Sequence, residues 1–187
     1  MKKYFLSGNN NKFREISSYI PDLEQLKFDD LPEIQSLDIE EIIKAKVEFA
    51  IDHLKFKNDI IILEDTGLYL NALNGFPGPL IKFMLESIGN EGIFKLCQCF
   101  SNFSAEAKTV FGIYHPKNAN KINFYSATIS GTISRPKGIY GFGWDSIFIP
   151  EGNNQTFGEM KTTQEKSNFS MRYIAMNKLL KEELINN

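Results

Sequence analysis

Two adjacent carboxylates that follow an apolar run are the residues best suited to chemistry in this chain. Residues 60–63 are all aliphatic, which is typical of a buried strand, and Glu64, Asp65, Thr66 and Gly67 follow directly. Carboxylates at a strand end are hard oxygen ligands that suit Mg²⁺, an ion that usually keeps waters and substrate phosphates as its other ligands. The alternative is a strand that ends in a polar turn, because Asp and Gly are common in turns.

A polar loop near the N-terminus has the residue types that bind phosphate. It connects an expected strand at 3–6 to an expected helix at 12–20 and consists of Ser7, Gly8, Asn9, Asn10, Asn11 and Lys12. A helix N-terminus offers unpaired N–H groups and a partial positive charge, to which Lys12 would add a full charge. The spacing and second glycine of the P-loop are absent, and a plain capped turn is the alternative.

One lysine lies on the apolar side of a predicted helix. Residues 38–56 have aliphatic side chains at helical spacing, with Asp38 as a candidate N-cap. At about 100° per residue from Ile39, Lys46 falls at about 340°, inside the apolar stripe. An inward lysine needs an anionic partner or a path to water. Lys46 therefore either points at an anion in a cleft or extends from the stripe to the surface.

An aromatic and acidic segment could recognise a nucleobase. Residues 141–145 include Phe142, Gly143, Trp144 and Asp145, and Trp144 is the only tryptophan of the chain. Aromatic rings stack on bases, and a carboxylate can read a base edge. A β-turn with a core tryptophan is the alternative.

Two cations flank the start of the last expected helix, at 170–184. Lys166 precedes this helix, and Met171 and Arg172 lie in its first turn. The helix is apolar on most faces, so Arg172 points inward or into a cleft. A pair of capping residues at the surface is the alternative.

Composition excludes several classes of function. The chain has 187 residues and a net charge of −2, which fits a single domain spanning 1–187. It has no Lys/Arg tract, so we expect no nucleic-acid partner. It has neither a signal peptide nor an apolar stretch of about 18 residues, so we expect a cytoplasmic protein without a membrane span. Cys97 and Cys99 are expected to be thiols on an amphipathic helix.

The remaining pattern predicts a mixed α/β protein. Strands are expected at 26–28 and 146–149, helices at 79–88 and 91–100, and an antiparallel pair at 107–114 and 122–134. This number of antiparallel segments argues against a simple doubly wound sheet.

Taken in order, these segments resemble the inosine triphosphate pyrophosphatase family over nearly the whole chain. The matching motifs are Ser7-Gly8-Asn9 with Lys12, Leu31-Pro32-Glu33, Glu64-Asp65-Thr66-Gly67 with Gly75 and Pro77-Gly78, Phe142-Gly143-Trp144-Asp145, Thr156-Phe157 with Glu159-Met160, and Glu165-Lys166 leading to Ser170 and Arg172. The resemblance implies an elongated mixed β-sheet flanked by helices, two lobes with a central substrate cleft, and a homodimer. It also implies Mg²⁺-dependent hydrolysis of deaminated purine nucleoside triphosphates to the monophosphate and pyrophosphate, with Mn²⁺ as an alternative ion.

The resemblance assigns roles to individual residues. Glu33 and Asp65 match the metal ligands, Asp65 also matches the base for the attacking water, and Glu64 takes a supporting role. The implied substrate-binding residues are Ser7, Gly8, Asn9, Asn10, Asn11, Lys12, Lys46, Thr66, Lys82, Phe142, Gly143, Trp144, Asp145, Lys166, Met171 and Arg172.

One residue departs from the family pattern. Met171 stands where the family commonly has histidine, which bears on discrimination between purine bases. Two other functions stay open at this point: a pyrophosphatase for another modified nucleotide, and a nucleotide-binding regulatory module without hydrolysis. Retention of Glu33, Asp65 and Lys12 argues against the second, because a pure binder does not need the acidic pair.

Overall fold

A computed structural model of the chain describes residues 1–28, 31–53, 58–117 and 121–185. The strands in these ranges are β1 (Lys3–Leu6), β2 (Leu23–Leu26), β3 (Ile60–Leu70), β4 (Pro77–Gly78), β5 (Ser104–Tyr114), β6 (Ile122–Ile133) and β7 (Phe148–Pro150). The α-helices are α1 (Asn10–Ser17), α2 (Ile39–His53), α3 (Ile81–Cys99), α4 (Thr163–Ser167) and α5 (Met171–Leu179), which continues as a π-helix over Leu180–Ile185. Short 3-10 helices span Asn71–Leu73 and Asp145–Ile147.

The described strands form one seven-stranded sheet. Its order is β2-β1-β3-β5-β6-β7, and β4 pairs with β3 off this path. β1 runs parallel to both β2 and β3, whereas β4 is antiparallel to β3 and β7 is antiparallel to β6. The predicted mixed α/β class is therefore confirmed.

The chain divides into two compact units, each built from several segments. The first comprises Met1–Asp65, Val110–Ser126 and Ala175–Asn187, and the second comprises Thr66–Thr109 and Ala127–Ile174. Strands β3, β5 and β6 each contribute residues to both units.

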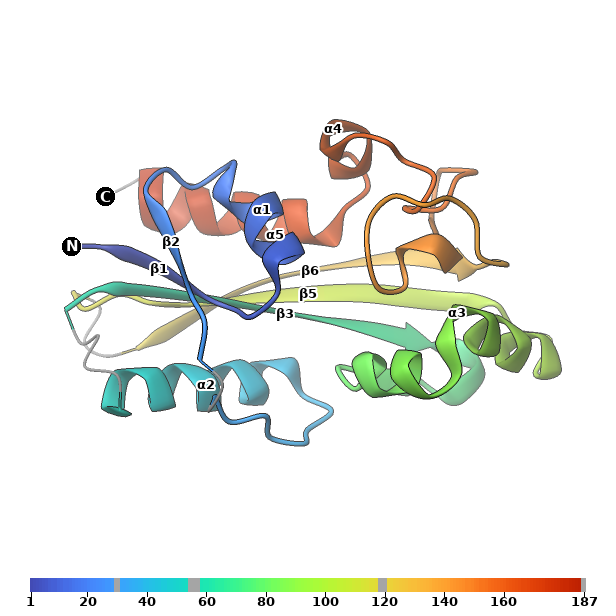
Figure 1. The fold of residues 1–187 in the computed structure, drawn as a ribbon, viewed down its shortest axis with the longest axis horizontal. Helices are drawn as coiled ribbons and strands as arrows, with labels where there is room; N and C mark the ends of the chain where they lie inside the picture. The colour runs from blue at the N-terminus through green and yellow to red at the C-terminus, as the bar shows by residue number, and fades with distance from the viewer. Residues whose placement is uncertain (29–30, 54–57, 118–120, 186–187) are drawn as a thin grey trace. The chain divides into compact units, whose positions relative to one another are not determined.

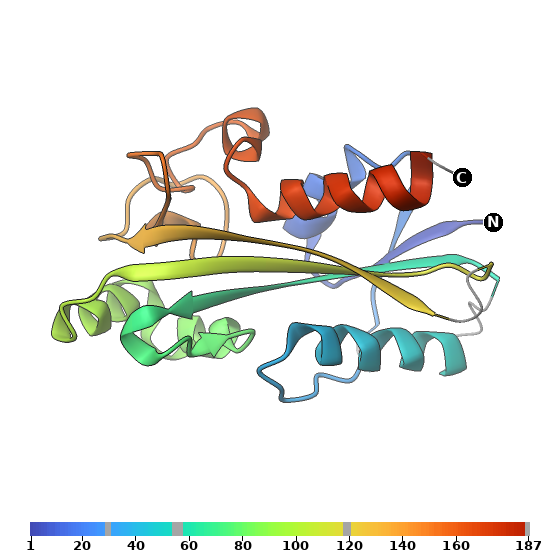
Figure 2. The same cartoon turned by 180° about the vertical axis from the view of Figure 1, so that it is seen from behind.

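In the first unit, helices lie on both faces of the strands. Figure 1 shows α2 along one face and α1 on the opposite face, and Figure 2 shows the same arrangement from behind. Ile43 and Val47 of α2 are buried, as the helical spacing predicts. Ile61 and Ile62 of β3 are buried too, which explains why this part of the strand is a continuous apolar run. Residues 54–56 of the predicted helix lie outside the described residues.

In the second unit, α3 lies on one face of the strands, and α4 with the long connection before it lies on the other (Figure 1). The backbone of α3 leaves helical geometry at Gly89, where φ is 64°. This is where the sequence predicts one helix to end and another to begin. No helix in the described ranges combines the length and apolar character needed to cross a bilayer.

The structure corrects the expected end of the central strand. β3 continues to Leu70, so Glu64 and Asp65 lie inside a strand and not at its end or in a turn. Pairing of Leu68 with Gly78 of β4 supplies a partner for this extension. Gly67 permits the close approach, because a Cβ there would come within 2.9 Å of the Gly78 carbonyl carbon.

Candidate active site

The loop after β1 forms a capped helix start. The Asn9 side chain accepts hydrogen bonds from the backbone N–H groups of Asn11 (2.9 Å) and Lys12 (3.1 Å), and the Ser7 hydroxyl accepts one from Asn9 N–H (3.1 Å). The capped turn that the sequence left as an alternative is therefore present. Gly8, Asn9, Asn10 and Asn11 are exposed, so the loop is accessible to a ligand.

Lys12 connects this loop to the acidic pair of β3. Its ammonium lies 3.0 Å from Glu64 Oε2 and 3.4 Å from Asp65 Oδ1. The Glu64 side chain has no exposed surface, whereas that of Asp65 is 25% exposed. A buried carboxylate is costly unless a positive charge compensates it, so Glu64 holds the lysine in place. We call Lys12, Glu64 and Asp65 the acidic cluster.

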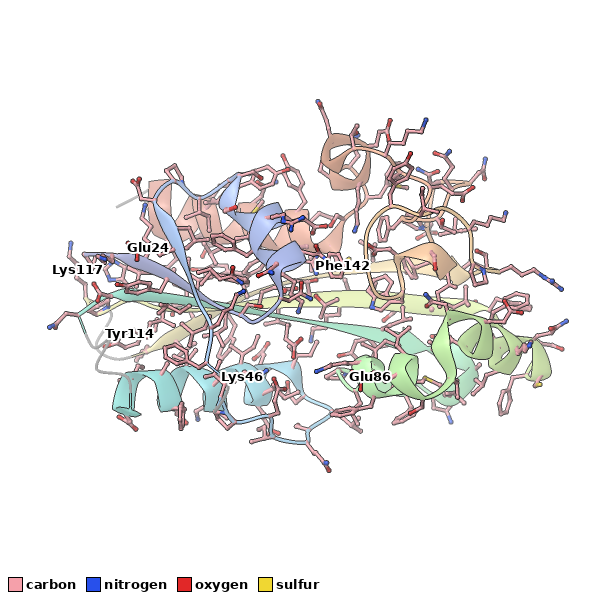
Figure 3. All side chains as sticks on the ribbon, in the orientation of Figure 1. Glu24, Lys46, Glu86, Tyr114, Lys117 and Phe142 are labelled. Atoms are coloured by element: carbon pink, nitrogen blue, oxygen red, sulfur yellow. The ribbon has the colours of Figure 1, made fainter. Side chains whose placement is uncertain are left out.

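Lys46 has the anionic partner that its inward position requires. Its ammonium lies 3.0 Å from Glu33 Oε1, and its side chain is only 14% exposed, whereas that of Glu33 is 75% exposed. Figure 3 labels Lys46 on α2. The structure thus brings together two residues that the sequence predicts to act on the same substrate and metal.

A second group of charged residues lies in the second unit, around a buried ion pair. Asp145 Oδ2 accepts hydrogen bonds from the Lys166 ammonium (2.8 Å) and from the backbone N–H of Phe142 (2.9 Å). The side chains of Lys166 and Asp145 are 10% and 8% exposed. Asp145 therefore fixes both the lysine and the loop that carries Phe142.

The Phe142 ring faces two cations. Lys166 Nζ lies 5.5 Å from the ring centroid and the Arg172 guanidinium carbon lies 5.4 Å from it, which is cation–π range. Lys166 and Arg172 are both buried, so the prediction of an inward Arg172 is confirmed and the surface pair is wrong. Phe142, labelled in Figure 3, is partly exposed. We call Phe142, Asp145, Lys166 and Arg172 the loop cluster.

Trp144 and Met171 are packed in the interior. The Trp144 ring contacts Phe148 edge to face, with centroids 5.4 Å apart, and lies 6.4 Å from Phe157. Trp144 is therefore a core residue, which is the alternative that the sequence left open. Met171 is buried too. Substrate contacts of these two side chains stay predictions.

Two other site residues have different surroundings. Lys82 is exposed in the first turn of α3, and no contact in the described residues joins it to the loop cluster. Thr66 is buried, and its hydroxyl accepts a hydrogen bond of 3.4 Å from Arg172 Nη2.

Sequence reasoning missed two residues that hold these groups. Asn90 of α3 donates to the Gly143 carbonyl (2.9 Å) and to the Ser146 hydroxyl (3.0 Å), which ties α3 to the loop. The only sequence feature that could have indicated Asn90 is its position next to Gly89, where one predicted helix ends. Thr109 of β5 lies 3.0 Å, hydroxyl to hydroxyl, from Thr66, and no motif marks it.

The acidic cluster suits a divalent cation with few protein ligands. No group of three or more His, Cys, Asp or Glu side chains that could hold a metal occurs in the described part of the chain. Mg²⁺ commonly binds through one or two carboxylates, with waters and substrate phosphates as its other ligands. The partly exposed carboxylate of Asp65 fits that requirement, whereas Glu33, which is exposed and pairs with Lys46, stays a predicted second ligand.

Comparison with known proteins identifies the family. The sequence pattern of the Ham1 family matches residues 3–182. The chain belongs to the Ham1 family. The matched range includes every residue of the acidic cluster and of the loop cluster.

Relatives of this Ham1 family member carry related names. It is 40% identical to an inosine triphosphate pyrophosphatase of Emericella nidulans, over 94% of this chain and 92% of the relative. It is 39% identical to a dITP/XTP pyrophosphatase of Pyrococcus horikoshii, over 92% of this chain and 91% of the relative. Among solved structures, the Ham1 protein of Staphylococcus aureus matches with a TM-score of 0.71 and 26% identity, covering 95% of this chain and 96% of that one.

Proposed function

We propose that this protein hydrolyses deaminated purine nucleoside triphosphates, such as those of inosine and xanthosine, to the monophosphate and pyrophosphate. The contact of Lys12 with both Glu64 and Asp65 is the observation that supports this best. It places a cation, a helix start and two carboxylates together, as phosphoryl chemistry requires. The names of the relatives support the same reaction and substrate class.

In this proposal, the first unit binds the triphosphate. Lys12, the helix start and Lys46 balance its negative charge. Lys82 belongs to the second unit, and its contact with the substrate stays a prediction. Glu64 stays buried and keeps Lys12 in position. Asp65 accepts the proton of the water that attacks the α-phosphorus, and pyrophosphate leaves as the α–β anhydride bond breaks.

A divalent cation, Mg²⁺ or Mn²⁺, completes the reaction centre in this proposal. Glu33 and Asp65 would hold it, and when bound it would neutralise phosphate charge and lower the pKa of its water. In the structure Glu33 pairs with Lys46. The two residues can therefore keep each other close to their working positions before substrate binds.

The loop cluster would recognise the base. The Phe142 ring offers a stacking face, and the cations Lys166 and Arg172 can donate hydrogen bonds to a 6-oxo group. Opposite adenine, the same donors would face a 6-amino group, which is itself a donor and offers them no acceptor. A buried donor without an acceptor costs about 1–3 kcal/mol, which is enough to discriminate between the two purines.

Pyrophosphate release is the test. Purified protein is incubated with Mg²⁺ and, in separate reactions, the triphosphates of inosine, xanthosine, adenosine, guanosine and thymidine. The products are identified by ³¹P NMR. We expect pyrophosphate from the first two, its loss with EDTA, and a fall of roughly 100-fold or more in Asp65→Asn. Asp52→Asn, at an exposed position of α2, is the matched control and should stay active.

Other outcomes would point elsewhere. Binding of inosine triphosphate without pyrophosphate release would favour a regulatory module. Preference for a standard or pyrimidine triphosphate would mean a different substrate. We also propose a homodimer, from the family resemblance, and a cytoplasmic protein without a nucleic-acid partner, from the composition. Light scattering would test the dimer, and fractionation would test the location.

A further inference from the structure

A buried threonine pair joins two neighbouring strands of the second unit. Thr109 of β5 has no exposed surface, and its hydroxyl lies 3.0 Å from that of Thr66 of β3. Two neighbouring residues of β5, Ala107 and Val110, are apolar and fully buried. A buried hydroxyl is costly unless it has a hydrogen-bond partner. Thr66 is the hydrogen-bond partner of Thr109, so the role of the Thr109 hydroxyl depends on the other contacts of Thr66.

Thr66 connects this pair to the loop cluster. Arg172 Nη2 lies 3.4 Å from Thr66 Oγ1, and a guanidinium can only donate, so the hydroxyl oxygen of Thr66 accepts this bond. The same guanidinium lies 5.4 Å from the Phe142 ring. Thr109, Thr66, Arg172 and Phe142 thus form one continuous series of contacts.

The rotamer of Thr66 decides whether Arg172 has this acceptor. A threonine side chain has three staggered χ1 states, and a rotation of about 120° would exchange its hydroxyl with its methyl group or its hydrogen. The guanidinium would then lose the bond. A second hydroxyl at hydrogen-bond distance favours the rotamer in which the Thr66 oxygen lies between Thr109 and Arg172.

We propose that Thr109 is a positioning residue for base recognition, acting through Thr66 on Arg172. This rests on the proposed function, in which Arg172 donates to the 6-oxo group of the base. Thr109 touches no reacting atom, so its hydroxyl affects substrate affinity and base preference and leaves the chemical step unchanged. A valine side chain has nearly the same shape as threonine but lacks the hydroxyl, so it would fill this position without forming the hydrogen bond.

Two matched substitutions separate the hydroxyl from the packing. Thr109→Val keeps the volume and removes the hydroxyl, whereas Thr109→Ser keeps the hydroxyl and removes a methyl group. For Thr109→Val we expect KM and the calorimetric Kd for inosine triphosphate to rise about three- to tenfold, the effect of one lost hydrogen bond. kcat should change by less than about twofold, and the preference for inosine over adenosine triphosphate should fall by the same factor as the affinity. Thr109→Ser should retain wild-type affinity and preference.

A double-mutant cycle tests the route through the arginine. In an Arg172→Met background, Thr109→Val should cause no further loss of affinity, because its effect requires the guanidinium. Additive losses would overturn the proposal. So would wild-type affinity in Thr109→Val, or equal losses in the valine and serine variants, which would indicate packing. Circular dichroism and thermal unfolding establish that each variant is folded.

Calorimetry separates this inference from the proposed function. If the wild type binds inosine triphosphate but releases no pyrophosphate, the hydrolytic function is wrong, and the Kd values of the two variants still decide the role of Thr109. If the wild type neither binds nor hydrolyses it, both proposals are overturned.

Discussion

Removal of one partner of the Lys166–Asp145 pair should destabilise the protein strongly. Lys166→Met leaves the Asp145 carboxylate buried with the Phe142 N–H at 2.9 Å but without the ammonium at 2.8 Å. Both side chains are at most 10% exposed, so solvent screens the pair little. Breaking a buried pair in this way typically costs about 3–5 kcal/mol. For a chain of this size each kcal/mol lowers Tm by about 2–4 °C, so we expect a fall of roughly 6–20 °C.

The double variant gives the sharper measurement. Asp145→Asn alone removes the carboxylate charge that lies 2.8 Å from the Lys166 ammonium and should also cost several kcal/mol, whereas Asp145→Asn with Lys166→Met removes both charges of the pair. Replacing a buried ion pair by uncharged groups often changes the free energy of unfolding little. The double variant should therefore be more stable than either single variant, by about 2 kcal/mol, in urea unfolding followed by circular dichroism. Its affinity for inosine triphosphate should stay low, because Lys166 is missing.

An exposed pair in the same unit is the control. Lys95 and Glu91 of α3 lie 4.0 Å apart with side chains 67% and 52% exposed, so Lys95→Met should change the free energy of unfolding by less than about 0.5 kcal/mol. Single variants of the buried pair that cost less than about 1 kcal/mol, or costs that simply add in the double variant, would refute the reasoning.

Three further predictions test other parts of the structure. Burial raises the pKa of Tyr125, and its hydrogen bond to Glu183 raises it further, so the folded state retains the proton more strongly and stability falls as pH rises above about 10. Tyr125→Phe should reduce this alkaline loss in unfolding titrations between about pH 8 and 11, and an unchanged slope would contradict it. Gly141 and Gly152 have similar positive φ angles of 77° and 80°, but only at Gly141 would a Cβ overlap the loop's buried carboxylate. Gly141→Ala should therefore be less stable than Gly152→Ala by about 1 kcal/mol or more and bind inosine triphosphate more weakly, and equal effects would exclude the overlap as the cause. Met171→His should leave hydrolysis of inosine triphosphate similar or higher; a large loss in kcat/KM would mean that the pocket is organised differently.

Local patterns predicted the features that depend on neighbours in the chain. Helical spacing alone indicated that Lys46 faces inward, and in the structure its side chain is 14% exposed and has an acidic partner. Asp38 was identified as a cap, and its side chain accepts from Glu40 N–H at 2.9 Å. Periodicity and capping act within a few residues, so the sequence contains them directly.

Features that depend on distant segments were predicted less well. The extent of β3 was underestimated, because its continuation depends on pairing with β4 and on contact at Gly67. An aspartate and a glycine after an apolar run are typical of a turn, and only a partner strand makes the extended backbone favourable here. The sequence also offered two environments for Trp144, and the aromatic residues around its ring decided between them.

Residue types and local spacing identify the groups available for chemistry, namely the acids of β3, the polar loop before α1, the inward lysine and the aromatic segment at 141–145. Which of these groups meet depends on the pairing of distant segments. Lys12 reaches Glu64 and Asp65 across more than fifty positions of sequence, and the Thr66–Thr109 pair exists only because β3 and β5 are neighbours in the sheet. The physical reason is that a buried charge or hydroxyl is stable only beside a partner, and the fold brings that partner from a distant segment.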